Sequence, residues 1–220
     1  MATGNRPVLT TEERTLVEAA VQAAERRTSA EIVPMIVERS GLYREARHRA
    51  GLVLALLTLT ALLTVESAWL PWGWHAANAA WLLLATVAAY ALGTWVGTWS
   101  PIIRLLTSRE RMHQKVRLRA ERAFVQHGIA RTRERIGVLV MLSLLERQVY
   151  VIADRSLRER ISSDQWQDVV AVVVERMKAG DLAGGLCRGI EAGGALLARA
   201  CPHGNGDNQN ELPNEVIQNP

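Results

Sequence analysis

The pattern of apolar and polar residues in the first part of the chain predicts a helix followed by a strand. Residues 10–27 place apolar side chains at helical spacing, and Thr10 with Glu13 forms a capping box, which together predict an amphipathic helix. Residues 30–38 form a short apolar run that predicts a strand. Pro34 inside this run favours an edge position or a bulge, because proline cannot donate a hydrogen bond to a neighbouring strand.

Two long apolar segments come next, at 51–70 and 78–100. Between residues 51 and 100 the only acid is Glu66, and there is no lysine or arginine. About 20 apolar residues in a helix cross a bilayer core of roughly 30 Å. A buried hairpin of soluble helices is the alternative, but it would need a larger surrounding protein to cover it. The pattern therefore predicts a transmembrane helical hairpin over residues 50–101.

Charge on either side of this hairpin sets its expected orientation. Arginines precede the first apolar segment at 39, 44, 47 and 49, and seven lysines and arginines follow the second between 104 and 122. The connecting loop has none. Positively charged flanks stay on the cytoplasmic side, so we expect two spans with both termini in the cytoplasm, in the inner membrane of a bacterium.

The tryptophans and glycines of the hairpin predict where it meets the membrane interface and how its two helices pack. The loop "ESAWLPWGWH" at 66–75 could bind a ligand, but its position between two spans favours anchoring at the membrane interface, where indole rings concentrate. Gly93 and Gly97 form a GxxxG pattern, which predicts close packing against the first span. The residues expected at the membrane interface are Trp69, Trp72, Trp74, Trp81, Trp95 and Trp99.

The remaining segments complete an expected α/β fold. A basic helix is predicted over 102–126, and apolar runs with short turns predict the further elements. These are an antiparallel pair of strands at 136–143 and 148–153, helices at 162–178 and 181–200, and a disordered polar tail at 201–220. The predicted fold class is a small α/β/α sandwich with the helical hairpin inserted after its first strand. The expected domain boundaries are 1–49, 50–101, 102–200 and 201–220.

Overall charge narrows the expected partners. The chain has a net charge of +4, and its cations cluster in the predicted basic helix. No aromatic or glycine pattern for base recognition accompanies them, so we expect residues 104–122 to contact anionic lipid head groups rather than nucleic acid. A solvated face that only sets topology is compatible with this expectation. Cys187 and Cys201 lack metal-ligand spacing and are expected to be reduced thiols.

Three stretches of the soluble part resemble the TPM domain family. They are "SAEIVPMIVE", "AFVQHGIARTRERIGVLVMLSLLERQVYVIADRSL" and "KAGDLAGGLCRGIEAGGALLA". The resemblance covers about residues 10–40 and 104–200, and it implies a small α/β sandwich. It also implies two properties found in some family members, divalent-metal binding and acid phosphatase activity. Many relatives look exported, whereas the charges of this chain place the domain in the cytoplasm, where scarce free Ca²⁺ makes a Ca²⁺-dependent function less plausible.

Carboxylates at one edge of the expected sheet could hold a metal. If the first two strands are parallel and the third returns antiparallel, Glu31 and Asp154 lie at the same end of the sheet. They could bind a divalent cation, Mg²⁺ or Ca²⁺, while Arg133, Arg135 and Arg155 hold an anion such as phosphate. The alternative is a charged edge of acid–arginine pairs, because two carboxylates do not complete a metal site.

The sequence supports two candidate functions of different classes. The first is a non-enzymatic, membrane-anchored interaction module that acts with a protein partner. The second is a metal-assisted phosphatase that uses Glu31 and Asp154. The sequence contains no GxSxG, HExxH, P-loop or GxGxxG motif, which favours the first. Transport is disfavoured because two spans without a buried charge cannot line a pore unless the chain oligomerises.

Overall fold

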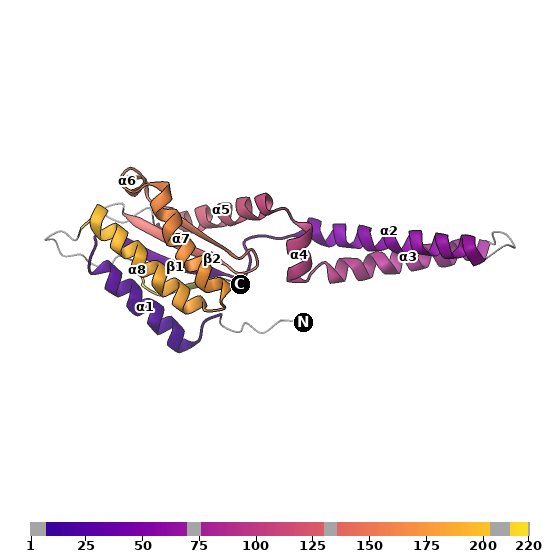
Figure 1. Ribbon diagram of the computed structural model, residues 1–220, viewed down its shortest axis with the longest axis horizontal. Coiled ribbons are helices and arrows are strands. Elements are labelled where there is room, and N and C mark those ends of the chain that lie inside the picture. The colour runs from indigo at the N-terminus through magenta and orange to yellow at the C-terminus, as the bar shows by residue number, and fades with distance from the viewer. Residues whose placement is uncertain (1–7, 70–75, 130–135, 203–211, 220) are drawn as a thin grey trace. The chain divides into compact units, whose positions relative to one another are not determined.

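The computed structural model describes residues 8–69, 76–129, 136–202 and 212–219. The chain folds into two compact units. We call Met1–Gly41 with His113–Pro220 the sheet unit, and Leu42–Met112 the hairpin unit. Figure 1 shows the helices and strands of each.

A four-stranded sheet in the order β3-β2-β1-β4 organises the sheet unit. β1 (Glu31–Val37) runs parallel to β2 (Gly137–Ser143) and to β4 (Ile217–Asn219). β3 (Gln148–Ala153) runs antiparallel to β2. The parallel and antiparallel pairings expected for the first three strands are therefore confirmed.

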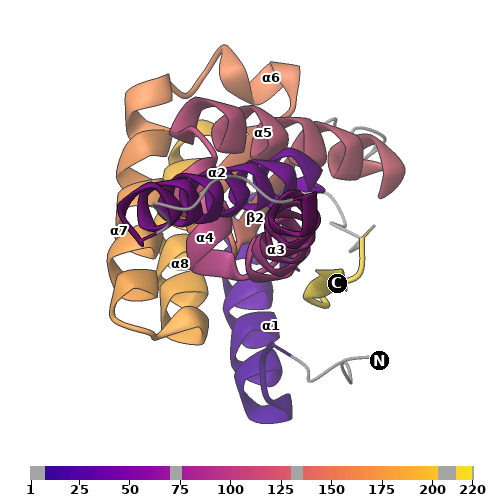
Figure 2. The same ribbon diagram turned by 90° about the vertical axis from the view of Figure 1, so that its right-hand side faces the viewer.

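Helices cover both faces of this sheet. Alternate side chains such as Ile32 and Val138 join a core with α1 (Thr11–Glu25), α7 (Ser163–Lys178) and α8 (Leu182–Ala200). Figures 1 and 2 both show α7 and α8 side by side. The other set, including Met35 and Met141, packs with the part of α5 (Arg109–Gln126) that belongs to the sheet unit. Because both faces are covered, every residue of β1 and β2 is buried, and the strands read as continuous apolar runs.

Local signals place the helix starts where the sequence predicted them. Thr10 and Glu13 form the expected capping box on α1, and Ser162 with Gln165 forms a second one on α7. The side chain of Asp181 caps α8 by accepting from a backbone N–H in its first turn. On α8, a Cβ at Gly189 would lie 2.2 Å from Val173 Cγ2, so glycine is needed for the close approach of α7.

The outer edge of β1 explains Pro34. The Glu31 N–H donates to the carbonyl of Ile136, the residue before β2, at 3.0 Å. Successive N–H groups of a strand point to opposite sides, so those of positions 32 and 36 point away from β2, as position 34 does. The Ile32 N–H donates to Glu25 Oε1 at 2.9 Å, and Pro34 has no N–H. Position 36 lies in the segment Met35–Val37 that pairs with β4. The predicted edge position is therefore correct for the first half of β1, beyond the reach of β4.

The prediction of a disordered tail is wrong where the structure describes it. Residues 217–219 form β4, and Pro202 makes an isolated bridge with Thr28, whose hydroxyl donates to the Cys201 carbonyl at 2.7 Å. A strand of three residues is too short to leave a periodic pattern in the sequence. Residues 203–211 and 220 lie outside the described residues.

The predicted basic helix at 102–126 is two helices. α4 (Ser100–Leu106) ends where Thr107 adopts an extended conformation, and α5 starts after it. The Ser108 hydroxyl accepts from the Arg111 N–H at 3.4 Å at this new start. Ser and Thr side chains compete with helical hydrogen bonds and favour such boundaries, and the pair Thr107–Ser108 was the signal.

The hairpin unit consists of α2 (Arg44–Trp69), α3 (Ala76–Val96), α4 and the start of α5. α2 and α3 lie side by side (Figure 1), and they are antiparallel because Gly97 lies against Arg47 while Gly93 lies against Gly51. Within the described residues, the segments Arg44–Val65 and Ala79–Val96 are long and apolar enough to cross a membrane. Helices inside soluble proteins can also meet this criterion.

Candidate functional site

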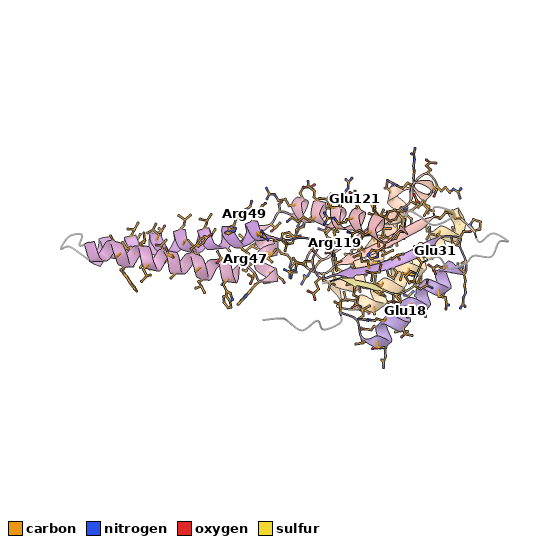
Figure 3. All side chains as sticks on the ribbon, turned by 180° about the vertical axis from the view of Figure 1, so that it is seen from behind. Glu18, Glu31, Arg47, Arg49, Arg119 and Glu121 are labelled. Carbon is orange, nitrogen blue, oxygen red and sulfur yellow. The ribbon has the colours of Figure 1, made fainter. Side chains whose placement is uncertain are left out.

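Glu31 and Asp154 lie at the same end of the sheet, as expected. Glu31 is paired with Gly137 of β2, and the N–H of Asp154 donates to the Gly137 carbonyl at 3.0 Å. Gly137 is therefore between them in the sheet. By the alternation of strand side chains, positions 31, 137 and 154 belong to the face that α5 covers. Figure 3 labels Glu31 near the start of its strand.

The two carboxylates do not converge on one point. Two strand spacings separate their backbones by about 10 Å. Ile129 fills the intervening space, since a Cβ at Gly137 would lie only 2.4 Å from the Ile129 carbonyl oxygen. Oxygen ligands lie roughly 2.0–2.6 Å from Mg²⁺ or Ca²⁺. Among the described residues, no group of three or more His, Cys, Asp or Glu side chains could hold a metal. A shared cation at Glu31 and Asp154 stays a prediction.

Asp154 has a local structural role. Its Oδ1 accepts from the backbone N–H of Arg155 and so caps α6 (Arg155–Arg158). Its Oδ2 is buried and has no hydrogen-bond partner among the described residues. The Arg155 side chain is 87% exposed and lies 3.8 Å from Glu159 along the same helix, so it does not turn back to this carboxylate. Arg133 and Arg135 lie outside the described residues.

A buried acid that the sequence analysis missed lies near Glu31. Glu25, at the end of α1, is only 8% exposed. Burial raises the pKa of its carboxyl from 4.5 to about 7; the Ile32 N–H lowers this pKa, the charge of Glu31 raises it, and a hydrogen bond with Asn214 lowers it. Glu25 continues the buried face of α1 one turn beyond Val21, so an acid on an apolar helix face was the signal.

A second polar cluster lies at the opposite end of the sheet, where the parallel strands β1 and β2 end. The Ser143 hydroxyl donates to Glu146 Oε2, and Ser143 and Ser40 share a hydrogen bond of 2.7 Å between their hydroxyls. The Ser40 N–H donates to Glu146 Oε1 at 2.9 Å. We call these three residues the serine cluster. Its groups satisfy one another and tie the β2–β3 turn to the segment after β1, a pairing that separate sequence segments could not reveal.

The tryptophans and glycines of the hairpin unit can be placed in part. Trp81, Trp95 and Trp99 are exposed, and the rings of Trp95 and Trp99 meet edge to face with centroids 5.7 Å apart. The Trp69 side chain, Trp72 and Trp74 lie outside the described residues. At Gly93 a Cβ would lie 2.8 Å from both the Ala50 carbonyl and the Gly51 Cα, so this glycine lies in the contact between α2 and α3.

A cavity of about 280 Å³ is found at the end of the hairpin where α2 begins. It is lined by Arg44, Arg47, His48, Tyr90 and Thr94. His48 Nδ1 and the Tyr90 hydroxyl are hydrogen-bonded at 2.9 Å across the two helices. The Thr94 hydroxyl donates to the Ala91 carbonyl at 2.7 Å, so the donors suited to an oxyanion are the two arginines and the His48–Tyr90 pair. Tyr90 and Thr94 lie in a predominantly apolar segment, so the sequence pattern alone did not connect them with the arginines.

The fold and these groups define a mixed α/β protein with an inserted helical hairpin. Residues 102–196 match the family model of the TPM domain, the family that the sequence motifs resemble. The N-terminal helix and first strand precede the matched residues, although β1 is hydrogen-bonded into the same sheet.

One solved structure is similar in fold. It is the NMR structure of the BA42 protein from the psychrophilic bacterium Bizionia argentinensis, with a TM-score of 0.61, 19% sequence identity and coverage of 100% of both chains. At this identity the likeness shows the fold alone. No curated protein matches the chain.

Proposed function

We propose that this chain is a membrane-anchored TPM-type module that binds a protein partner and carries out no catalysis. Its α/β sheet unit would lie in the cytoplasm, tethered by α2 and α3. The observation that carries the proposal is the outer surface of the hairpin. Large apolar side chains on both helices are exposed, for example Leu56 at 62% and Leu83 at 70%. Soluble proteins rarely expose so continuous an apolar surface, and lipid would cover it.

The distribution of charge supports the orientation. α3 contains no lysine or arginine, and in α2 all of them lie in its first two turns. The next cations follow α3, beginning at Arg104. Moving these cations across a bilayer is costly, so they favour the cytoplasmic side, together with both termini.

The polar groups of the sheet unit support a binding role over catalysis. Glu25 receives the free N–H of β1, Asp154 caps a helix, and the serine cluster holds a turn. These side chains are used in holding the fold together. Glu31 and Asp154 are two strands apart with Ile129 between them, which disfavours the phosphatase alternative.

Alkaline carbonate extraction of membranes from expressing cells tests the anchor. We expect the full chain to remain in the membrane pellet. The variant Leu56→Arg/Leu83→Arg should move to the soluble fraction, because each arginine at a span centre costs roughly 2.5–3.5 kcal/mol of insertion free energy. Leu16→Arg, an equally exposed site on α1, is the matched control and should stay in the pellet. Complete extraction of the unsubstituted chain would refute the anchor.

The non-catalytic role has its own test. Purified full chain should hydrolyse a generic phosphomonoester no faster than Glu31→Gln/Asp154→Asn, with or without Mg²⁺, Mn²⁺ or Ca²⁺. Cross-linking in membranes followed by purification in detergent should recover a reproducible protein partner. Metal-dependent hydrolysis lost in the double variant would establish the phosphatase instead.

A further inference from the structure

The cavity at the start of α2 combines cationic side chains from one helix with hydroxyls from the other. Arg44, Arg47 and His48 come from the first turns of α2, and Tyr90 and Thr94 come from α3. Figure 3 labels Arg47 near this end of the helix. The lining contains no acidic residue.

The two cavity arginines differ from their neighbours in having no counter-ion among the described residues. Arg49 lies 3.9 Å from Glu45, and Arg111 also forms an ion pair with Glu45. Glu45 thus forms ion pairs with two arginines that do not line the cavity. Arg44 and Arg47 have no ion pair with any residue in the described part of the chain. Uncompensated positive charge therefore faces the cavity, where an anion would be favoured.

The wall opposite the arginines is held in place by packing. A Cβ added at Gly51 would lie 2.7 Å from Thr94 Cγ2 and 2.8 Å from Tyr90 Cε2, so both side chains pack closely against the α2 backbone at Gly51. The hydrogen bond between His48 Nδ1 and Tyr90 orients the imidazole. The His48–Tyr90 pair, ordered in this way, would bind an oxyanion without a large ordering cost.

We propose that this cavity binds the phosphate head group of an anionic phospholipid. The inference rests on the proposed membrane anchor, which places this end of the hairpin at the cytoplasmic interface. The cavity is smaller than the roughly 300–1,000 Å³ typical of sites for drug-sized ligands, so it suits a head group whose acyl chains remain outside. Exposed apolar side chains next to it on α2 and α3, such as Leu52 and Leu92, offer a surface for those chains.

Lipid-exchange measurements on the full chain in nanodiscs provide the test. Nanodiscs of phosphatidylcholine receive a small fraction of spin-labelled phosphatidylglycerol, and the immobilised label reports the lipid held by the protein. We expect Arg44→Gln/Arg47→Gln to weaken the preference for phosphatidylglycerol about tenfold, since both side chains line the cavity and add direct contacts to the general attraction of surface cations for anionic lipid. Arg104→Gln/Arg109→Gln removes the same charge outside the cavity, and it should change the preference less than about threefold.

A neutral substitution separates a cavity from diffuse surface charge. Tyr90→Phe removes only the hydroxyl that orients His48, so it should weaken the preference about threefold without changing the charge. An unchanged preference in Tyr90→Phe together with equal losses in the two arginine pairs would overturn the site. Inorganic phosphate, titrated into the chain in neutral detergent, should bind far more weakly than the lipid. Phosphate binding as tight as lipid binding would overturn the lipid assignment.

Failure of this inference can be told from failure of the anchor. Insertion into the nanodisc is measured first, by co-elution with the disc after carbonate treatment. A chain that does not insert refutes the proposed anchor. A chain that inserts but shows no preference for phosphatidylglycerol over phosphatidylcholine refutes only the head-group site.

Discussion

At the scale of single residues, two buried polar side chains of the sheet unit, Glu25 and Ser143, are satisfied by specific partners. Glu25 is buried because the edge of β1 presents an N–H that no strand reaches, and the carboxylate accepts it. Ser143 is fully buried because Glu146 and Ser40 satisfy its hydroxyl. Removing either arrangement should therefore change stability in a specific way.

Glu25→Gln should change how stability depends on pH. Because the pKa of Glu25 is about 7 in the folded chain against an ordinary 4.5, the folded state binds more protons between these values. The stability linked to this group is thus fullest below pH 4.5 and falls as the pH rises through about 7. Gln still accepts from Ile32 but does not ionise. From pH 4.5 to 8 the free energy of unfolding of the variant should rise, relative to the unsubstituted chain, by about 2–3 kcal/mol.

Denaturant unfolding of the full chain in detergent, at several pH values, measures this difference. Glu18→Gln, the same substitution at a partly buried position of the same helix, is the matched control. Figure 3 labels Glu18. A pH-independent difference between Glu25→Gln and the unsubstituted chain would contradict the raised pKa.

Ser143→Ala should destabilise the sheet unit by about 1–3 kcal/mol, because it leaves the buried Glu146 carboxylate without one of its donors. Ser40→Ala should cost less, since the Ser40 backbone N–H still donates to Glu146. The exposed Ser163→Ala serves as the control. Thermal unfolding of the three variants would give this order, and equal melting temperatures for all three would argue against the serine cluster.

At the scale of elements, the sequence predicted the helices and strands whose apolar pattern extends over many residues. It missed features that form only when another element of the fold is present. The first three strands, their directions and the capped helices α1, α7 and α8 follow from apolar runs, capping residues and glycines. β4 could not be predicted, because three residues form a strand only when the edge of β1 is present. The cavity in the hairpin unit could not be predicted either, because its lining residues come together only when α2 and α3 pack against each other.

Deleting residues 212–220 tests the contribution of β4. The deletion removes the strand, the buried Val216 and the hydrogen bond of Asn214 with Glu25. We expect a loss of about 2–4 kcal/mol in the free energy of unfolding. We also expect more aggregation, measured by light scattering, since a bare strand edge pairs with other chains. Deleting Pro220 alone is the control, and an equal effect of the two deletions would contradict the role of β4.

Gly93→Leu tests the contact between α2 and α3. The new side chain would meet the α2 backbone, whose atoms lie 2.8 Å from the Cβ position, so the helices must separate. We expect a cost of about 1–3 kcal/mol, seen as a lower midpoint when dodecyl sulfate is titrated into the detergent-solubilised chain. Ala91→Leu, on the exposed side of α3, should leave the midpoint unchanged. If both substitutions lower it equally, close packing at Gly93 is not required.

At the scale of the whole molecule, two units with different surfaces share one chain. The sheet unit encloses its apolar residues between helices, whereas the hairpin unit presents large apolar side chains outward. Under the proposed function, water covers the first surface and lipid covers the second. The sequence indicated this division, because charge is excluded from the apolar segments and concentrated on both sides of them.

The central claim is that α2 and α3 span the membrane with the sheet unit in the cytoplasm. Paired reporter fusions test it most directly: alkaline phosphatase, active only outside the cytoplasm, and a fluorescent protein, active only inside. Each is inserted between residues 70 and 75 or joined after residue 220. We expect phosphatase activity only for the fusion between residues 70 and 75, and fluorescence only for the C-terminal fusion. Fluorescence from both positions would contradict it.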